Sequence, residues 1–479
     1  MKKDIFEKRI DKSMGDLDID SSEIIKKNKK NKALKIGLPI VILGLATCVT
    51  LAIVLPLTLN KDDIKPITNN VIRYSKAKDK VSISKKSYEI YNSFYTSFTS
   101  YVFKDNCESS ITYSPFDCFV NLALIAYSSS DATQEELLTL FGTNNINDVT
   151  VAVNELTYAL GTPTYDSAKV ESGAYSTNAI FLNPDEVTLS EDEESKKVIT
   201  MVNNDYHASI FKSAPTTGNL YQWLLKSVPD EYRPLPSVKI PNGESLSLAV
   251  ASSYFIKKYF NEEKKSTELE NYKSKSHYLD YFIDSSSSKV DYLTLGSTSS
   301  KYCEGKNFTG YKSKGDGEDL GFSFYTSNNS DSYYESICEI SKNDYKVSDK
   351  DVYVYTDVPY FNISNSLDLI PSLKNAGMKN IFDENNAGML SKLIGEDNIY
   401  LTFMKQFSIS RFDYNGFYQA SVTVSAGDKG TEPTDEVHVS LDKPFIYVNS
   451  NSVNVDGNEM DLPISIGLII EPGYPQYNV

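Results

Sequence analysis

The chain of 479 residues contains little histidine, tryptophan or cysteine. Its three histidines, His207, His277 and His438, do not stand at metal-ligand or Ser-His-Asp spacings. The sequence also has no GxSxG, HExxH, P-loop or GxGxxG pattern, each of which marks a known kind of catalytic or cofactor site. We therefore expect a protein that is not an enzyme and that binds no cofactor and no metal.

The charge is predominantly negative, with a formal net value of −16. The first 35 residues carry eleven Lys or Arg and seven Asp or Glu, so the excess of acid lies in the rest of the chain. An acidic surface repels phosphate, which argues against nucleic acid as a partner.

A single long apolar run, IGLPIVILGLATCVTLAIVLPLTL, covers residues 36–59 without any charge. As a helix these 24 residues would span roughly 36 Å, enough for a hydrocarbon core of about 30 Å. The run is too long for a cleaved signal peptide, and lysines precede it, so it predicts a transmembrane signal anchor. We expect residues 1–35 to be a cytoplasmic tail, residues 60–85 a stalk, and the remainder to be extracellular at the cell membrane.

Four cysteines, Cys107, Cys118, Cys303 and Cys338, follow the apolar run. In an oxidising compartment they permit three disulfide pairings. Four unpaired thiols are equally compatible with the spacing, so the sequence leaves the disulfide state open.

Periodicity in the remainder predicts an α+β fold with large, mostly antiparallel β-sheets. Residues 87–103 repeat apolar positions at helical spacing, and Pro115 suits the first turn of a buried helix that follows a short strand at 111–113. Asp131 or Thr133 is suited to capping a further helix that ends near Gly142. The remaining predicted elements are strands at 174–184, 245–260 and 417–426, a strand and short helix within 358–383, and a hairpin that turns at Asp456-Gly457.

Several of these segments resemble the serpin family of serine protease inhibitors. TYSPF…NLALIAY…ATQEELL is similar to the second and third helices of the family, and STNAIFL to its central sheet strand. SSYFIKKYF, VPYFNISNSLDLIPSLKNAGMKNIFD, KGTE, KPF and ISIGLIIEPGYP then follow in the family's order. The resemblance covers residues 86–475 and implies a serpin-like domain there.

The resemblance implies a metastable inhibitor in which a protease cuts an exposed loop, and the loop then enters the main sheet as a new strand. The hinge would be Gly430, Thr431 and Glu432. The reactive-loop candidates would be the residues after it: Pro433, Thr434, Asp435, Glu436, Val437, His438 and Val439.

Counted from that hinge, the loop is short. Ten residues separate Glu432 from Lys443 and reach at most about 36 Å, roughly half of what the family's loop offers. Pro433 lacks the N–H of a central strand, and either Asp435 or Glu436 would be buried by strand alternation.

Two further features depart from the family. Asp117 stands where the family has a small hydroxyl residue after Ser-Pro, and residues 417–424 lack the family's histidine. Ser114 and Pro115 are retained, and Trp223 falls where serpins carry a tryptophan on a helix beside the sheet.

Three hypotheses follow. The short loop favours a membrane-anchored, non-inhibitory protein that binds another extracellular or host protein. The family itself implies a suicide inhibitor of a secreted or host serine or cysteine protease. In the third hypothesis the fold is only a stable carrier for a surface antigen or adhesin.

Overall fold

A computed structural model describes residues 64–67, 82–160, 173–228, 235–241, 243–259, 278–283, 286–313, 320–329, 332–385, 387–395, 398–413, 416–419 and 436–473. Contacts divide the chain into two units, Met1–Asp63 and Ile64–Val479. All described residues belong to the second unit.

The helices in this part of the chain are α4 (Lys85–Phe103), α5 (Pro115–Ser128), α6 (Asp131–Leu140), α7 (Ile146–Leu160), α8 (Glu193–Asn204), α9 (Thr217–Ser227), α11 (Tyr333–Lys342), α12 (Ile370–Asn375) and α13 (Ser391–Ile394). Short 3₁₀ turns occur at Gly243–Ser245 and Asn380–Phe382. The strands are β1 (Ser82–Ile83), β2 (Ile111–Tyr113), β3 (Gly173–Leu182), β4 (Ala208–Lys212), β5 (Leu248–Tyr259), β6 (Tyr278–Ile283), β7 (Ser286–Glu304), β8 (Phe308–Ser313), β9 (Leu320–Ser327), β10 (Lys346–Pro359), β11 (Phe361–Asp368), β12 (Lys405–Asp413), β13 (Gly416–Gln419), β14 (Glu436–Ser440), β15 (Phe445–Val455) and β16 (Asn458–Ile469).

These strands form two sheets. The first sheet has six strands in the order β11-β12-β13-β5-β3-β4. The second has ten, with the main path β14-β10-β7-β8-β9-β15-β16-β2, to which β1 and β6 add at β15 and β7. Most neighbouring pairs are antiparallel, which confirms the predicted α+β architecture.

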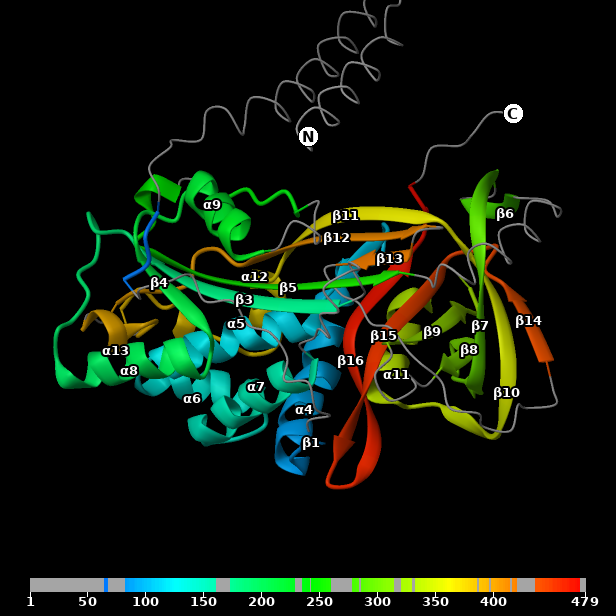
Figure 1. Ribbon diagram of the computed structural model, residues 1–479, viewed down its shortest axis with the longest axis horizontal. Helices are drawn as coiled ribbons and strands as arrows, with labels where there is room; N and C mark the ends of the chain where they lie inside the picture. The colour runs from blue at the N-terminus through cyan, green and yellow to red at the C-terminus, as the bar shows by residue number, and fades with distance from the viewer. Residues whose placement is uncertain are drawn as a thin grey trace, which may run out of the picture. The chain divides into compact units, whose positions relative to one another are not determined.

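Helices cover both faces of the six-stranded sheet, as Figure 1 shows, with α9 on one face and α5 among the helices on the other. On the first face, Trp223 of α9 meets Phe181 of β3 edge to face, with ring centroids 6.3 Å apart. On the opposite face, Asn121 of α5 donates a hydrogen bond to the Val250 carbonyl oxygen of β5 at 3.2 Å. The sheet is therefore a central layer buried from two sides.

The main core is rich in aromatic rings from α4, α5 and α6. Phe94 of α4 lies 5.6 Å from Phe119 of α5 and 5.8 Å from Phe141, which follows α6. All three side chains are fully buried. Because burying an aromatic ring is worth several kcal/mol, this cluster explains why the helical face predicted over residues 87–103 forms.

Local signals place several elements correctly. Pro115 begins α5, and the Ser114 hydroxyl caps this helix by accepting from the Asp117 N–H at 3.3 Å. The β15–β16 hairpin turns at Asp456 and Gly457, both with positive φ, as the Asp-Gly signal predicts. The predicted cap of α6 was wrong, since the N-cap residue is Ser130 rather than Asp131 or Thr133.

Part of the predicted stalk, residues 64–67, lies on the edge of the six-stranded sheet. The Ile67 N–H donates to the Ile210 carbonyl oxygen of β4 at 2.6 Å, and Pro66 forms a bridge with Phe211. Lys226 of α9 donates to the Ile64 carbonyl oxygen at 2.8 Å. This short segment therefore belongs to the folded body.

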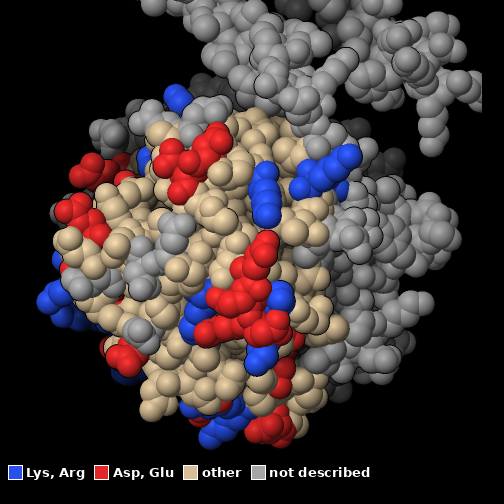
Figure 2. All heavy atoms as spheres, turned by 90° about the vertical axis from the view of Figure 1, so that its left-hand side faces the viewer, with Lys and Arg blue, Asp and Glu red and all other residues tan. Residues whose placement is uncertain are grey.

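No helix in the described ranges is long and apolar enough to cross a membrane. Residues 36–59, the predicted signal anchor, lie outside these ranges. Cys107, Cys118, Cys303 and Cys338 are unpaired thiols in the structure. Figure 2 shows acidic and basic side chains interspersed on one face of the molecule.

Candidate functional site

The six-stranded sheet contains a short strand, β13, at its centre. After β12 ends at Asp413, the chain reverses, and β13 runs back between β12 and β5. Phe417 pairs with Phe412 on the β12 side, and Gln419 pairs with Ile256 on the β5 side. The Phe417 ring is 1% exposed and lies 5.1 Å from Phe322 and 6.1 Å from Tyr447 between ring centroids. β13 is therefore held by main-chain pairing on both sides and by a buried ring.

Beyond Gln419 the gap between β5 and β12 continues without a strand in the described part of the chain. There, residues 248–255 of β5 pair only with β3, and residues 405–409 of β12 pair only with β11. We call this part of the gap, in which the described residues place no strand, the slot. Each of its two borders presents main-chain groups of the kind that accept an added strand.

A cavity of about 390 Å³ lies in the slot. Its walls come from β5 and β12, from α5 on one face of the sheet, and from α9 on the other. Apolar side chains such as Ile125, Leu220 and Ile240 line much of it, together with Asp117 and Trp223. The volume is in the range of ligand pockets, so the slot is large enough to hold a peptide strand or a small molecule.

Four polar residues join both borders of the slot to the first turn of α5. The Ser114 N–H donates to Gln406 Oε1 at 2.8 Å, and Gln406 Nε2 donates to the Ser114 carbonyl oxygen at 2.9 Å. Gln406 Nε2 also lies 3.4 Å from Asp117 Oδ2. From the other border, the Ser252 hydroxyl donates to the Asp117 carbonyl oxygen at 3.1 Å. α5 thus holds β12 through Gln406 and β5 through Ser252.

Asp117 is incompletely satisfied in this cluster. Burial raises the pKa of its carboxyl group to about 6, although the Ser252 hydroxyl and the Gln406 amide partly offset the rise. Its Oδ1 atom has no hydrogen-bond partner among the described residues. The sequence marked Asp117 as a departure from the family, and the structure places this residue at the slot.

Sequence reasoning missed Gln406 and Ser252. The family resemblance implies a histidine partner for the Ser114 region within residues 417–424, whereas the structure supplies the partner from β12 as Gln406. Alternation within KQFSISRFD indicates a strand but not that Gln406 contacts a residue 292 positions away.

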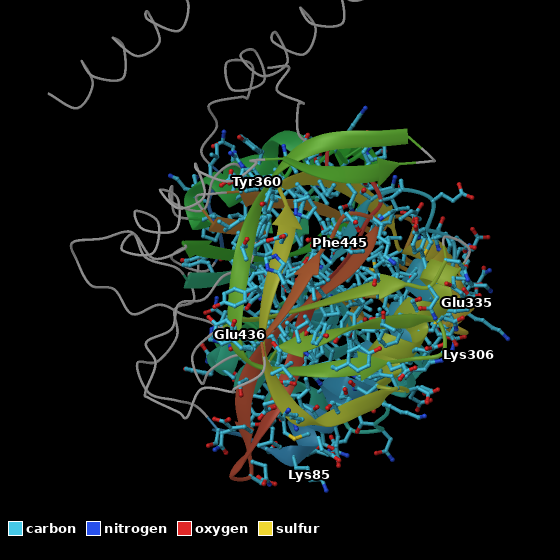
Figure 3. The ribbon with its side chains drawn as sticks, turned by 90° about the vertical axis from the view of Figure 1, so that its right-hand side faces the viewer. Lys85, Lys306, Glu335, Tyr360, Glu436 and Phe445 are labelled. Atoms are coloured by element: carbon cyan, nitrogen blue, oxygen red, sulfur yellow. The ribbon has the colours of Figure 1, made fainter. Side chains whose placement is uncertain are left out.

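The predicted reactive-loop residues fall into two groups. Gly430, Thr431, Glu432, Pro433, Thr434 and Asp435 lie outside the described residues, so their roles stay predictions. Glu436, Val437, His438 and Val439 lie in β14, which pairs in parallel with β10 from Tyr353 to Asp357. Figure 3 shows Glu436 on the opposite side of the view from Lys306 and Glu335, and β14 is the first strand in the order of the ten-stranded sheet.

β14 is anchored through the buried carboxylate of Asp357. Asp357 Oδ2 lies 2.8 Å from His438 Nε2 and accepts from the Ser440 hydroxyl at 3.0 Å. Its Oδ1 atom accepts from the Thr294 hydroxyl of β7 at 2.6 Å. The strand is therefore fixed to β10 by side chains as well as by the main chain.

These positions define the length of the segment that joins the two sheets. β13 ends at Gln419 in the first sheet and β14 begins at Glu436 in the second, which leaves 16 residues, 420–435, between them. Sixteen residues in extended conformation span at most about 55 Å. The ten residues counted from Glu432 are only part of this connection.

Comparisons with known proteins agree with this architecture. The chain is similar to the native state of the thermophilic serpin tengpin, with 17% identity, a TM-score of 0.61, and coverage of 85% of this chain and 100% of that one. Serpin48 of the insect Tenebrio molitor gives 16% identity, a TM-score of 0.57, and coverage of 80% and 98%. The complex of thyroxine-binding globulin with thyroxine gives 15% identity, a TM-score of 0.57, and coverage of 81% and 99%. These likenesses show that the chain has the serpin fold.

The model of the family described as Serpin (serine protease inhibitor) matches residues 330–455, which contain β11, β12, β13 and β14. No curated protein matches the chain. Residues 330–455 thus match the serpin family model and the chain has the serpin fold, in agreement with the resemblance in its sequence.

Proposed function

We propose that the protein inhibits a serine-type protease by placing the segment after β13 into the slot once the protease has cut the connection to β14. The observation that supports this proposal most directly is the position of β13, which already lies between β5 and β12. An entering segment would only extend an existing strand.

The register of β13 defines which residues would enter. Gly416 pairs with Tyr259 and Gln419 with Ile256, so continued pairing would bring Gly427 opposite Leu248, the first residue of β5. The residues between, ASVTVSAG at 420–427, contain no proline and no charge and are small or β-branched. Such residues enter a central strand without the penalties that Pro433 or Asp435 would impose.

The cut would then fall between residues 428 and 435, since these residues follow the inserted stretch and precede β14. Lys429 is the only Lys or Arg between Arg411 and Lys443. A protease with an acidic specificity pocket, of the trypsin type, would cut after Lys429. We propose that the Lys429–Gly430 bond is the bait, in place of residues 433–439.

The test uses residues 64–479 mixed with trypsin and analysed on a denaturing gel. We expect a covalent complex that survives boiling, together with a C-terminal fragment that begins at Gly430. Lys429→Ala should abolish both, whereas Lys443→Ala, a matched change beyond β14, should not. If cleavage after Lys429 released active trypsin and the cleaved protein were no more stable to heat than the uncut protein, the inhibitor proposal would be wrong.

A non-inhibitory binding role is the second candidate, and Phe417 favours it. A ring buried among Phe322, Phe361 and Tyr447 fixes β13 before any cut, which opposes further movement. Thyroxine-binding globulin with its thyroxine is a protein of this fold in complex with a small molecule. In this role the protein would retain an extracellular partner without being cut.

We further propose that residues 36–59 anchor the protein in the cell membrane with residues 60–479 outside. The support is the uncharged run and the lysines before it. Full-length protein should remain with membranes after alkaline extraction, whereas residues 64–479 should be released.

A further inference from the structure

We propose that the cavity in the slot binds an amphipathic amine, with the ammonium group at Asp117 and the apolar body along the walls from α5 to α9. The site does not depend on protease inhibition. It goes beyond the function proposed above, because it gives the uncut protein a small-molecule ligand.

Two residues that line this cavity each carry a buried polar atom, of opposite character, without a hydrogen-bond partner among the described residues. Asp117 Oδ1 is an acceptor on the α5 side, and Trp223 Nε1 is a donor on the α9 side. The Trp223 side chain is 2% exposed, so water does not readily satisfy its N–H. Buried polar atoms without partners cost about 1–3 kcal/mol each, and a ligand that supplied both partners would recover that cost.

The charge of the ligand follows from the surroundings of Asp117. The groups that face its carboxyl are Tyr113 of β2 and Cys118 of α5, both kept neutral because burial raises their pKa values. The polar partners from the strands, Ser252 and Gln406, carry no charge. Lys405 lies in the cavity wall on β12 but does not contribute to the pKa of Asp117. A buried carboxylate without a cation is best completed by a positive donor.

The remaining walls determine the body of the ligand. Ile125, Leu220, Leu224, Val238 and Ile240 are apolar and come from both sides of the sheet. An apolar chain or ring would bury against them, and an oxygen at its far end would accept from Trp223 Nε1. The class is therefore a hydrophobic primary amine, preferably one that also carries a hydroxyl or carbonyl group.

Trp223 provides the measurement, because it is the only tryptophan in the chain and lines the cavity. Its fluorescence, excited where the tyrosines do not absorb, is followed in residues 64–479 during titration with 4-phenylbutylamine, 4-phenylbutan-1-ol and 4-phenylbutyrate. These probes share one apolar body and differ in head group. We expect the amine to bind at least tenfold more tightly than the alcohol, a difference of about 1.4 kcal/mol, and the acid to bind most weakly.

Variants of Asp117 and a pH series test whether the preference for the amine over the alcohol depends on Asp117. Asp117→Asn should make the amine and the alcohol bind equally, and Asp117→Ser serves the same purpose if the first variant does not fold. Asp105→Asn, which removes an exposed carboxylate elsewhere, should change nothing. The amine's advantage should also shrink as the pH falls through about 6, where Asp117 takes up a proton.

Equal binding of amine and alcohol to the unchanged protein would overturn the proposal, and so would a Trp223 signal that no probe alters. Tighter binding of the acid would assign the site to Lys405 instead. None of these results bears on trypsin trapping, so the two proposals fail separately.

Discussion

The segment 420–435 runs from β13, which leads into the slot, to β14, and each of these two regions contains a buried carboxylate with different surroundings. At the β14 end, Asp357 is bonded by His438, Ser440 and Thr294. At the β13 end, Asp117 has one long contact from Gln406 and one oxygen without a partner in the described structure. A satisfied cluster fixes an element, whereas an unsatisfied one favours any change that completes it. The β14 end is therefore built as an anchor, and the slot end is built to accept something further.

The largest effect is expected from a variant that places a charged side chain in the slot, because it tests directly whether the slot accepts an added strand. By the β13 register, residue 423 would lie opposite Ser252 of β5 and also opposite Gln406 of β12. Thr423→Glu should therefore prevent insertion and abolish the covalent trypsin complex, because a buried unpaired carboxylate costs several kcal/mol. Thr431→Glu carries the same charge beyond the inserted stretch and should still trap.

This pair of variants also decides where the hinge lies. If the hinge were at Gly430 to Glu432, as the sequence predicted, Thr431→Glu would be the damaging change and Thr423→Glu would be neutral. The gel that detects the complex distinguishes the two outcomes directly.

The next largest expected effect is a loss of stability when the buried ring of β13, the strand that lies between β5 and β12, is removed. Phe417→Ala removes a buried ring that packs on Phe322, Phe361 and Tyr447, so the free energy of unfolding should fall by about 3–4 kcal/mol. Urea unfolding of the uncut protein measures it. Met460→Ala, at a side chain that is 38% exposed, is the control and should change the value by less than about 1 kcal/mol. An equally small loss for Phe417→Ala would mean that β13 is not held in the sheet.

Whether a feature could be predicted from the sequence depended on how far apart in the chain its interacting residues lie. The helix α4, the Pro115 start of α5 and the Asp456-Gly457 hairpin depend on neighbouring residues, so periodicity and turn chemistry were sufficient. The alternating pattern at 417–426 likewise indicated a strand, and Gly416–Gln419 form one.

The site depended on pairings between distant parts of the chain. The likeness of KGTE to a family motif predicts a hinge at Gly430 to Glu432, which lies outside the described residues. β13 pairs with β12, which directly precedes it, and with β5, about 160 residues earlier, and no local pattern specifies the second pairing. Asp117 was noticed as unusual, but its effect on the slot required the positions of Gln406 and Ser252.

The third test removes the charge of Asp117 and measures how the stability of the protein then depends on pH. The folded-state pKa of about 6 lies above the ordinary value of 3.8, so the ionised form is the one that folding disfavours. The contribution of Asp117 to stability is therefore fully present below about pH 4 and is lost as the pH rises through about 6. Asp117→Asn should remove this dependence and raise the free energy of unfolding at pH 7 by up to about 3 kcal/mol.

Thermal unfolding of both proteins between pH 4 and pH 8 is the measurement. The two curves should separate as the pH rises, while Asp105→Asn should follow the unchanged protein throughout. Parallel curves would show that Asp117 is already satisfied.

The smallest expected effect lies at the anchor. His438→Ala removes one partner of Asp357, but the His438 side chain is 59% exposed and Ser440 and Thr294 remain. Global stability should therefore fall by only about 0.5–1 kcal/mol. The local effect is more informative, because an edge strand held by five paired positions can open without the rest of its sheet. Hydrogen exchange should become faster at the β14 amides in His438→Ala and stay unchanged at β13. Faster exchange at β13 as well would mean that the two ends of the segment are coupled, and the distinction between an anchor and an accepting slot would then fail.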